Sequence, residues 1–243
     1  MNIILLTKED LSCSMTDTAS SFEVVLTDRR AEHICKVHKP ELGQCLKVGL
    51  LDGLIGEGEV LALDAKLNKV HLKISLQFPP PAKLPLTVVL ALPRPKMLRR
   101  IVQSLSTLGV AQLILVNSYR VEKSYWQTPF LDRLDDYVRL GLEQSVDTVP
   151  MQIQIEQRFK PFVEDRLEDM VNNRLALVAH PYDSPPCPIA VDEDLILAIG
   201  PEGGFITYEV EKLKSVGFTS VSLGARIQKV ETVIPQLVGR LFS

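Results

Sequence analysis

The distribution of apolar residues predicts alternating strands and helices over the last two thirds of the chain. Uninterrupted apolar runs rich in branched residues are typical of buried strands, and apolar residues three and four positions apart indicate helices with one buried face. An alternation of this kind predicts an α/β domain. We expect strands at residues 86–92, 112–117, 152–155, 175–179, 195–199 and 219–223, and helices at 97–108, 129–145, 159–172, 208–216 and from 231 onward.

The first part of the chain has a different pattern, which predicts a small β-barrel. Short strands separated by turns are expected at residues 22–26, 46–51, 59–63 and 70–76, with one helix at 29–37 that Asp28 caps. Residues 78–85 contain four prolines, which we expect to stop both strands and helices and to form an extended linker. We therefore place one domain at residues 1–77 and a second at 86–243.

Two glycine loops follow the last two predicted strands. The sequence G-P-E-G-G occupies residues 200–204, and G-A-R-I occupies residues 224–227. Glycine has no side chain, so a glycine loop lets backbone groups approach a ligand closely. In α/β sheets, ligand-binding loops gather at the carboxyl ends of the strands. Neither loop has the G-x-G-x-x-G or Walker pattern, which disfavours a dinucleotide or nucleoside triphosphate. The residues alone favour a small ligand held mainly by backbone, and two ordinary strand-to-helix turns are the alternative.

Composition and charge place the chain among ordinary globular proteins. It has 243 residues, a net charge of −3, 46% hydrophobic and 23% charged residues. The overall charge does not favour nucleic acid, so only local clusters count. Arg94, Lys96, Arg99 and Arg100 form one cluster at the start of a predicted helix, where cations oppose the helix dipole. This placement favours an anionic partner, with a solvated helix face as the alternative.

Other sequence features concern the compartment of the cell. No apolar run approaches the length of about 18 residues that a membrane span needs, and the first residues lack the basic region of a secretory signal. Cys13, Cys35, Cys45 and Cys187 show no paired spacing, which favours a reduced cytoplasmic chain over a disulfide framework or a zinc site. We expect a cytoplasmic protein with no metal and no membrane partner.

The segment L-A-I-G-P-E-G-G-F, followed by L-G-A-R-I-Q-K-V-E-T, resembles the paired signature of the SPOUT RNA methyltransferases. The most similar branch is RsmE, whose pattern is G-P-E-G-G and then L-G-x-R-I-L-R-x-E-T. RsmE enzymes methylate N3 of a uridine in small-subunit ribosomal RNA. The resemblance implies a PUA-like barrel that holds RNA, a SPOUT α/β domain with a trefoil knot and a mostly parallel sheet, S-adenosylmethionine as cofactor, and a homodimer.

The resemblance also implies roles for individual residues. Guanidinium groups are expected at the target base, on Arg94, Arg120 and Arg226. The cofactor is expected at Leu177, Ala179, Ile199, Gly200, Glu202, Gly203, Gly204, Leu223, Gly224, Ile227, Glu231 and Thr232. Contact with RNA is expected from Arg29, Arg30, Lys36, Lys96, Arg99 and Arg100. No metal ligand is implied.

The chain departs from the RsmE pattern at several charged positions. Ser104 and Thr107 replace a lysine and a glutamate, and an arginine that follows Glu143-Gln144 in the family is absent, with Asp147 nearby. Three hypotheses therefore stay open. The chain is a uridine-N3 methyltransferase of small-subunit ribosomal RNA, a diverged member with another RNA target, or a non-catalytic RNA-binding factor.

Overall fold

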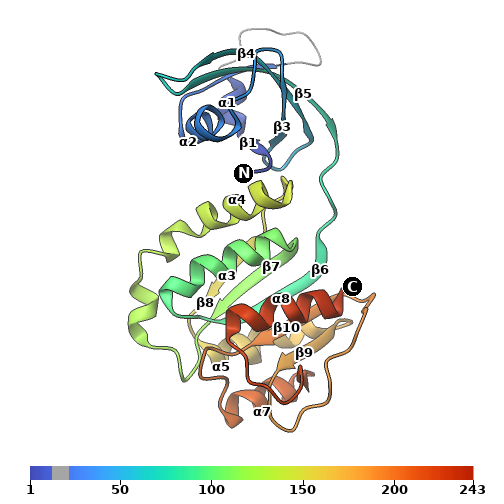
Figure 1. Cartoon of the computed structure of the whole chain (residues 1–243). Coiled ribbons are helices and arrows are strands. Elements are labelled where there is room, and N and C mark those ends of the chain that lie inside the picture. The colour runs from blue at the N-terminus through green and yellow to red at the C-terminus, as the bar shows by residue number, and fades with distance from the viewer. Residues whose placement is uncertain (13–21, 243) are drawn as a thin grey trace. The chain divides into compact units, whose positions relative to one another are not determined.

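The structure, a computed structural model, describes residues 1–12 and 22–242 (Figure 1). Cys13, one of the four cysteines, lies outside the described residues. The chain forms two compact units, of which unit 1 comprises Met1–Ala82 and Arg139–Pro150. Unit 2 comprises Lys83–Val138 and Met151–Ser243. The segment Arg139–Pro150 thus packs with the N-terminal residues, although its sequence position suggested the second domain.

Unit 1 is built on a curled five-stranded sheet, a half-barrel, in the order β1-β3-β4-β5-β2. Strand β1 runs parallel to β3, and the other pairs are antiparallel. The strands are β1 (Ile4–Leu6), β2 (Phe22–Leu26), β3 (Cys45–Leu50), β4 (Ile55–Asp64) and β5 (Lys69–Phe78). The helices are α1 (Lys8–Ser12) and α2 (Arg29–His33), the latter continuing into the π-helical turn η1 (Ile34–His38).

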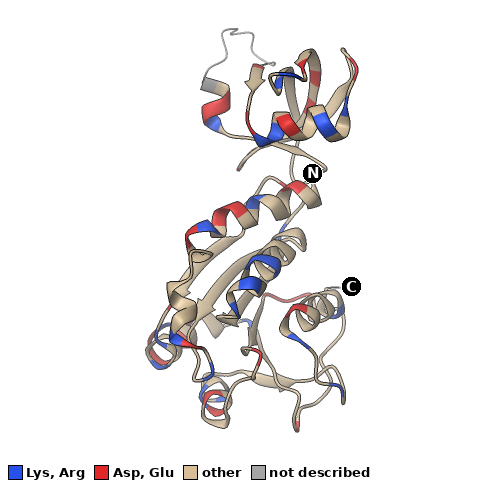
Figure 2. Cartoon of the chain, turned by 60° about the vertical axis from the view of Figure 1, so that its left-hand side comes forward, with Lys and Arg blue, Asp and Glu red and all other residues tan. Residues whose placement is uncertain are grey.

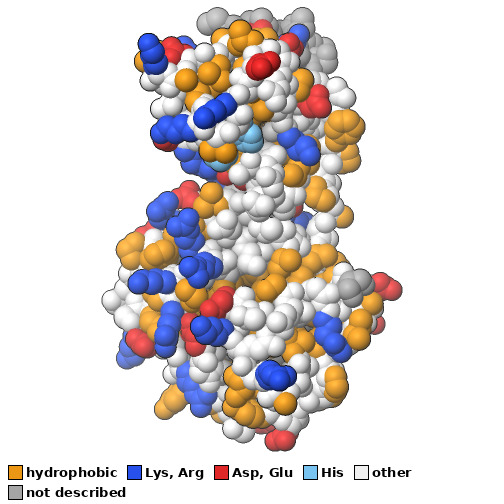
Figure 3. Space-filling model, in the orientation of Figure 1, with side chains coloured by type: hydrophobic (Ala, Val, Ile, Leu, Met, Phe, Trp, Pro, Cys, Tyr) orange, Lys and Arg blue, Asp and Glu red, His pale blue; other side chains and the backbone are white. Residues whose placement is uncertain are grey.

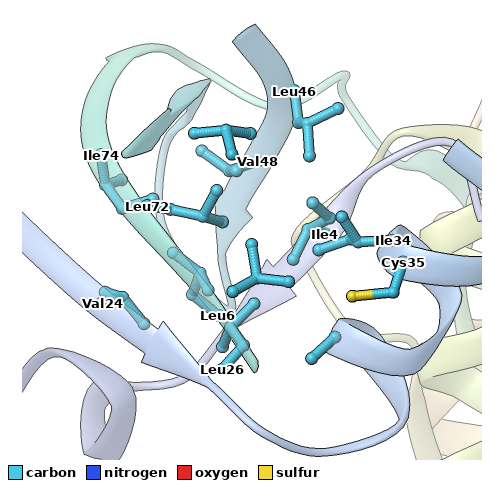
Figure 4. Close-up of a cluster of buried hydrophobic side chains, with 13 residues drawn as sticks. Ile4, Leu6, Val24, Leu26, Ile34, Cys35, Leu46, Val48, Leu72 and Ile74 are labelled. Carbon is cyan, nitrogen blue, oxygen red and sulfur yellow. The ribbon is translucent and has the colours of Figure 1, made fainter. Parts of the chain in front are cut away.

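Alternate residues of the strands fill the core of unit 1, as a period of two requires. Val24 and Leu26 of β2 and Leu72 and Ile74 of β5 are buried, and they point toward Ile34 and β1 inside the curled sheet (Figure 4). Strand β1 was not predicted, because three residues are too few to show an alternation. Gly56 of β4 permits the curl, since a Cβ there would lie 1.8 Å from the Ser75 carbonyl oxygen, at a shift in register.

Unit 2 contains a six-stranded sheet in the order β11-β9-β10-β6-β7-β8, in which every recorded pair is parallel (Figure 1). Its strands are β6 (Leu84–Ala91), β7 (Val110–Val116), β8 (Gln152–Glu156), β9 (Leu175–Ala179), β10 (Leu195–Ile199) and β11 (Thr219–Val221). Its helical segments are α3 (Pro95–Thr107), η2 (Lys123–Gln127), η3 (Leu131–Arg133), α5 (Phe159–Phe162), η4 (Val163–Leu167), α6 (Glu168–Val171), α7 (Thr207–Ser215) and α8 (Val230–Leu241). Helix α4 (Leu134–Ser145) contributes its first residues to unit 2 and its last to unit 1.

Three segments differ from the predicted elements. The helix expected from residue 129 begins as the 3-10 turn η3 and is α-helical only from Leu134. The helix expected at 159–172 is interrupted by the π-helical turn η4. Pro85, assigned to the linker, lies inside β6. A shift in register between Leu84 and Thr87 accommodates it, because a proline cannot donate to a regular ladder.

The parallel sheet brings the loops after four of its strands to one edge of unit 2. Ile199 of β10 is level with Ala179 of β9 and with Leu90 of β6, and Val221 of β11 is also level with Ala179. The carboxyl ends of these strands therefore lie side by side, which is where ligands bind in sheets of this type. Among the described residues, no helix is both long and apolar enough to span a membrane.

Candidate active site

The two glycine loops line one cavity of unit 2, with a volume of about 220 Å³. The loop after β10 contributes residues 200–205, and the loop after β11 contributes residues 222–224 and 226–228. The end of β9 adds His180, Pro181 and Tyr182, and α8 adds an apolar wall. Loops separated by about twenty residues in sequence thus form a single binding site at the carboxyl edge of the sheet.

Close packing within the first loop requires glycine at position 200. A Cβ at Gly200 would lie 2.7 Å from the backbone nitrogen of Phe205, which cannot move without disturbing the turn. Gly204 has a φ of +72°, a conformation that favours glycine, and its N–H donates to the Pro201 carbonyl at 2.7 Å. The loop therefore presents backbone groups to the cavity in a fixed turn.

Neighbouring loops hold this glycine loop from two directions. The Glu202 carboxylate accepts a hydrogen bond from the backbone N–H of Arg94 at 3.0 Å, which joins the loop after β10 to the loop after β6. The Arg120 guanidinium donates to the Gly203 carbonyl, and a Cβ at Gly203 would lie 2.9 Å from Arg120 Cδ. Arg120 thus reaches the cavity from the loop after β7.

A buried carboxylate that the sequence did not indicate, Glu209, bonds to the loop after β7 and to the segment before α7. Glu209 in the first turn of α7 is 3% exposed and accepts hydrogen bonds from Ser118 Oγ, the Tyr119 N–H and the Ile206 N–H. A glutamate in the first turn of a helix can bond the backbone N–H that precedes the helix, so the bond to Ile206 was visible in the sequence. The hydrogen bonds from Ser118 and Tyr119 could not be predicted from the sequence, because these residues are about 90 positions from Glu209 along the chain.

The second glycine loop supplies a different chemical group. Gly224 has a φ of +105°, and Arg226 and Ile227 are exposed at the cavity. The Gln228 side-chain oxygen is buried, and within the described part of the chain it has no hydrogen-bond partner. A buried acceptor without a partner is costly, so this oxygen is available to a donor on a ligand. The RsmE pattern has leucine at this position, and sequence reasoning did not select it.

The environment of His180 favours the neutral form of its ring. Burial lowers the pKa of His180 below its ordinary value, and the positive charge of Lys214 lowers that pKa further. The ring packs edge-on against Tyr182, with centroids 5.6 Å apart. The neutral imidazole that this environment favours packs at the cavity wall.

The remaining residues that the resemblance implied divide into two groups. Arg120 and Arg226 line the cavity, as do nine of the expected cofactor residues: Ala179, Ile199, Gly200, Glu202, Gly203, Gly204, Leu223, Gly224 and Ile227. Leu177, Glu231 and Thr232 are not among the described residues that line it. Leu177 is buried within β9, and the other two lie in the first turn of α8. The side chain of Arg94 is exposed, and its backbone N–H donates to Glu202 of the glycine loop.

Two of the cations expected to contact RNA have partners inside unit 1. Arg30 donates to Asp10, Asp28 and the Leu5 carbonyl oxygen, and its side chain is 12% exposed. Burial lowers the pKa of Arg30, but the two carboxylates outweigh burial and raise the pKa above its ordinary value. Arg29 makes two hydrogen bonds to the buried Glu143. These contacts give Arg29 and Arg30 structural roles that the sequence did not reveal.

The other expected cations lie on helical surfaces. Lys36 pairs with Glu32 one turn away in unit 1. Lys96, Arg99 and Arg100 are exposed on α3. Figure 2 marks basic positions along this helix, and Figure 3 shows basic side chains on the same side of unit 2. The Arg99 guanidinium also lies 5.9 Å from the centre of the Tyr137 ring. The structure thus provides a basic surface on α3.

Comparison with known proteins defines the class. A family model described as an RNA methyltransferase domain matches residues 80–241, which include the sheet, both glycine loops and the cavity. The described residues contain no group of three or more His, Cys, Asp or Glu side chains placed to hold a metal ion.

Relatives with assigned names match nearly the whole chain. A protein of Treponema pallidum named ribosomal RNA small subunit methyltransferase E is 30% identical over 241 residues, which cover 96% of this chain and 87% of that protein. A Borreliella burgdorferi protein named ribosomal RNA small subunit methyltransferase E 1 is 23% identical, with coverages of 96% and 93%. The chain belongs to the RsmE family of SPOUT RNA methyltransferases, which confirms the resemblance of the two motifs.

Solved structures share the fold of both units. A putative methyltransferase of Legionella pneumophila, in complex with S-adenosylmethionine, superposes with a TM-score of 0.71 at 19% identity, covering 98% of this chain and 95% of that one. A ribosomal RNA small subunit methyltransferase E of Neisseria gonorrhoeae, bound to S-adenosylmethionine, gives 0.69 at 18% identity, with coverages of 98% and 95%. The predicted fold class, a PUA-like barrel followed by a mostly parallel SPOUT α/β domain, is confirmed.

Proposed function

We propose that this protein transfers a methyl group from S-adenosylmethionine to N3 of a uridine in small-subunit ribosomal RNA. The observation that carries the proposal is the convergence of the two family motifs on one cavity at the carboxyl edge of the parallel sheet. The names of the relatives from Treponema pallidum and Borreliella burgdorferi support the choice of substrate. The cofactor named for the Legionella pneumophila and Neisseria gonorrhoeae structures supports the choice of methyl donor.

The residues of the cavity fit this cofactor. A Cβ at Gly204 or Gly224 would meet nothing within 4 Å, so the backbone at these positions is open to a ligand, and Gln228 offers an unused acceptor for an N–H or O–H group. Ile199, Val221 and Leu237 supply apolar surface for a ring system. When bound, S-adenosylmethionine supplies an electrophilic methyl group on a sulfonium centre.

The chain's own contribution to methyl transfer is orientation and charge. As the uridine N3–H releases its proton to solvent water, negative charge spreads to the neighbouring carbonyl oxygens of the base. A guanidinium that lies near these oxygens stabilises that charge without a metal. We assign this role to Arg120 and Arg226, which are exposed at the cavity. Arg94 has a supporting role, because its backbone N–H fixes Glu202.

Recognition of RNA is proposed for two regions. The exposed cations Lys96, Arg99 and Arg100 of α3 would neutralise phosphates near the reacting uridine. The PUA-like half-barrel of unit 1 would hold a further part of the RNA. Arg30 is omitted from this surface because its charge is taken up by Asp10 and Asp28. We also propose a homodimer in the cytoplasm and a trefoil knot in unit 2, as the family implies.

Mapping of methylated uridine by mass spectrometry tests the proposal. Ribosomal RNA from a strain with the gene deleted should lack one N3-methyluridine of the small subunit. The wild-type gene should restore it, and Gly203→Arg, which places a large side chain against Arg120, should not. A modification profile that does not change on deletion would exclude this uridine as the target. It would favour a different RNA substrate, for which the departures at Ser104 and Thr107 already provide a reason.

A further inference from the structure

The position of the Arg120 side chain needs an explanation, because the residue is exposed. Long surface side chains lose much rotamer entropy when they are held in one place. The Arg120 guanidinium donates to the Gly203 carbonyl, and the aliphatic part of Arg120 occupies the space that a Cβ at Gly203 would need. These contacts persist only if the backbone at Arg120 and the glycine loop keep a fixed separation.

The Glu209 carboxylate fixes that separation. Its Oε1 accepts from the Tyr119 N–H at 2.7 Å, directly before Arg120. Its Oε2 accepts from the Ile206 N–H at 3.0 Å, two residues after the glycine loop, and from Ser118 Oγ at 3.2 Å. Both oxygens are used, the side chain is 3% exposed, and bonds of this kind to a carboxylate are stronger than neutral ones.

We propose that Glu209 is the positioning residue for Arg120 in methyl transfer. One buried carboxylate joins the segment that carries Arg120 to the segment that carries the glycine loop, so it sets where the guanidinium lies relative to the cavity. Glu209 is not among the described residues that line the cavity, and it therefore acts through Arg120. The inference rests on the function proposed above.

A purely structural role would have a different signature. As a helix cap alone, Glu209 would stabilise α7 and the glycine loop, and its loss would weaken cofactor binding and catalysis independently of Arg120. As a positioning residue, its loss should reduce turnover mainly by misplacing Arg120. A double-mutant cycle separates the two roles, because residues that act through one another are not additive.

The informative substitution is Glu209→Gln. A side-chain amide has a single acceptor oxygen, so it can serve the Tyr119 N–H or the Ile206 N–H but not both. The matched control is Glu211→Gln on the same helix, since Glu211 is exposed and pairs with Lys214 on the surface. The affinity for S-adenosylmethionine is measured by calorimetry. The kcat and KM are measured with small-subunit RNA from the deletion strain, for wild type, both variants, Arg120→Ala and Arg120→Ala with Glu209→Gln.

We expect Glu209→Gln to lower kcat by about tenfold to 100-fold, as misplacement of a positioned group does, with little change in cofactor affinity. The double variant should be no slower than Arg120→Ala alone, and Glu211→Gln should match wild type. Effects of Glu209→Gln and Arg120→Ala that multiply, or a loss of cofactor affinity as large as the loss of kcat, would overturn the inference.

Two further outcomes are distinguishable. If Glu209→Gln does not fold, Ser118→Ala removes only the hydroxyl that binds Glu209 Oε2, and its non-additivity with Arg120→Ala is judged in the same way. If wild type binds S-adenosylmethionine and methylates the RNA while the cycle is additive, only the positioning role fails. If wild type neither binds the cofactor nor methylates the RNA, the proposed function fails and this inference fails with it.

Discussion

At the scale of single residues, Gly200 is required by its neighbours. A Cβ at this position meets the backbone nitrogen of Phe205 at 2.7 Å, so the first glycine loop tolerates no side chain there. Gly239 in α8 has the opposite environment, because a Cβ there would meet nothing within 4 Å. The two glycines therefore provide a matched pair for testing the loop.

Gly200→Ala should lower the affinity for S-adenosylmethionine by about tenfold or more, equivalent to about 1.4 kcal/mol, because the loop must shift to accept the Cβ. Gly239→Ala should leave the affinity unchanged and stabilise α8 by up to about 1 kcal/mol. Calorimetry and urea unfolding measure both effects. Equal cofactor affinities for the two variants would contradict the role of the loop.

The buried oxygen of Gln228 gives a second prediction at this scale. When no ligand is bound, the unpaired Gln228 oxygen destabilises the fold. A ligand that donates a hydrogen bond to this oxygen removes that cost. Gln228→Leu should therefore leave the thermal midpoint of the ligand-free protein unchanged or raise it. It should also weaken cofactor binding by about 1 kcal/mol, as the loss of one hydrogen bond does. A variant that loses stability and keeps its affinity would show that Gln228 has a structural role.

At the scale of elements, Arg30 joins three parts of unit 1. It connects α2 to Asp10 of α1, to Asp28 at its own N-terminus and to the Leu5 carbonyl of β1. Burial raises the pKa of Asp10, but hydrogen bonds from Arg30 and Thr7 outweigh it and hold that pKa below the ordinary value of 3.8. Asp28 behaves in the same way. The cluster is therefore more stable when both carboxylates are ionised.

Removal of Arg30 should destabilise unit 1 and change its dependence on pH. Arg30→Gln leaves Asp10 without its cation in a largely buried site, and we expect a loss of about 3 kcal/mol. Because the carboxylate pKa values are lowered in the folded state, this stabilisation is present above pH 3.8 and is lost as the pH falls further. Urea unfolding between neutral and acid pH should show a weaker acid dependence in the variant.

The control for this cluster is Lys36→Gln, which removes an exposed pair with Glu32. Such surface pairs contribute about 0–1 kcal/mol, so its stability should remain close to that of wild type. If Arg30→Gln were as stable as Lys36→Gln, the cluster would not hold the three elements together.

At the scale of the whole molecule, the net charge of −3 does not indicate nucleic-acid binding, whereas the distribution of charge does. Basic side chains gather on the α3 side of unit 2, where Lys96 and Arg100 are exposed (Figure 3). On the proposed function, attraction to RNA depends on this local surface, and added salt should weaken it because the release of counterions from the RNA is then less favourable.

Arg100→Gln should weaken RNA binding and should reduce the slope of log affinity against log salt concentration by about 0.7 to 0.9, the change for one phosphate contact. Cofactor affinity should not change. Lys214→Gln on α7, which removes a cation paired with Glu211, is the control and should keep the wild-type slope. Binding measured by fluorescence anisotropy across a salt series tests both variants. An unchanged slope for Arg100→Gln would remove α3 from the RNA-binding surface.

The sequence by itself determined the strands of unit 2 and the two glycine motifs. Residues 175–179 and 195–199 were predicted with the bounds that the structure shows, because a strand buried on both faces is a continuous apolar run. The motifs were visible because glycine is required locally, by close approach at Gly200 and by positive φ at Gly204 and Gly224. The trefoil knot stays a prediction.

Only the tertiary structure decided which polar groups meet. The family resemblance placed Arg29 and Arg30 on an RNA-binding surface, whereas folding brings Glu143 to the first and Asp10 to the second. In the sequence, Glu209 is one of several acidic residues in a predicted helix. Its hydrogen bond from the loop after β7 is seen only in the folded structure. Local patterns report burial and backbone conformation, whereas a hydrogen bond between residues about 90 or 114 positions apart depends on how the whole chain is packed.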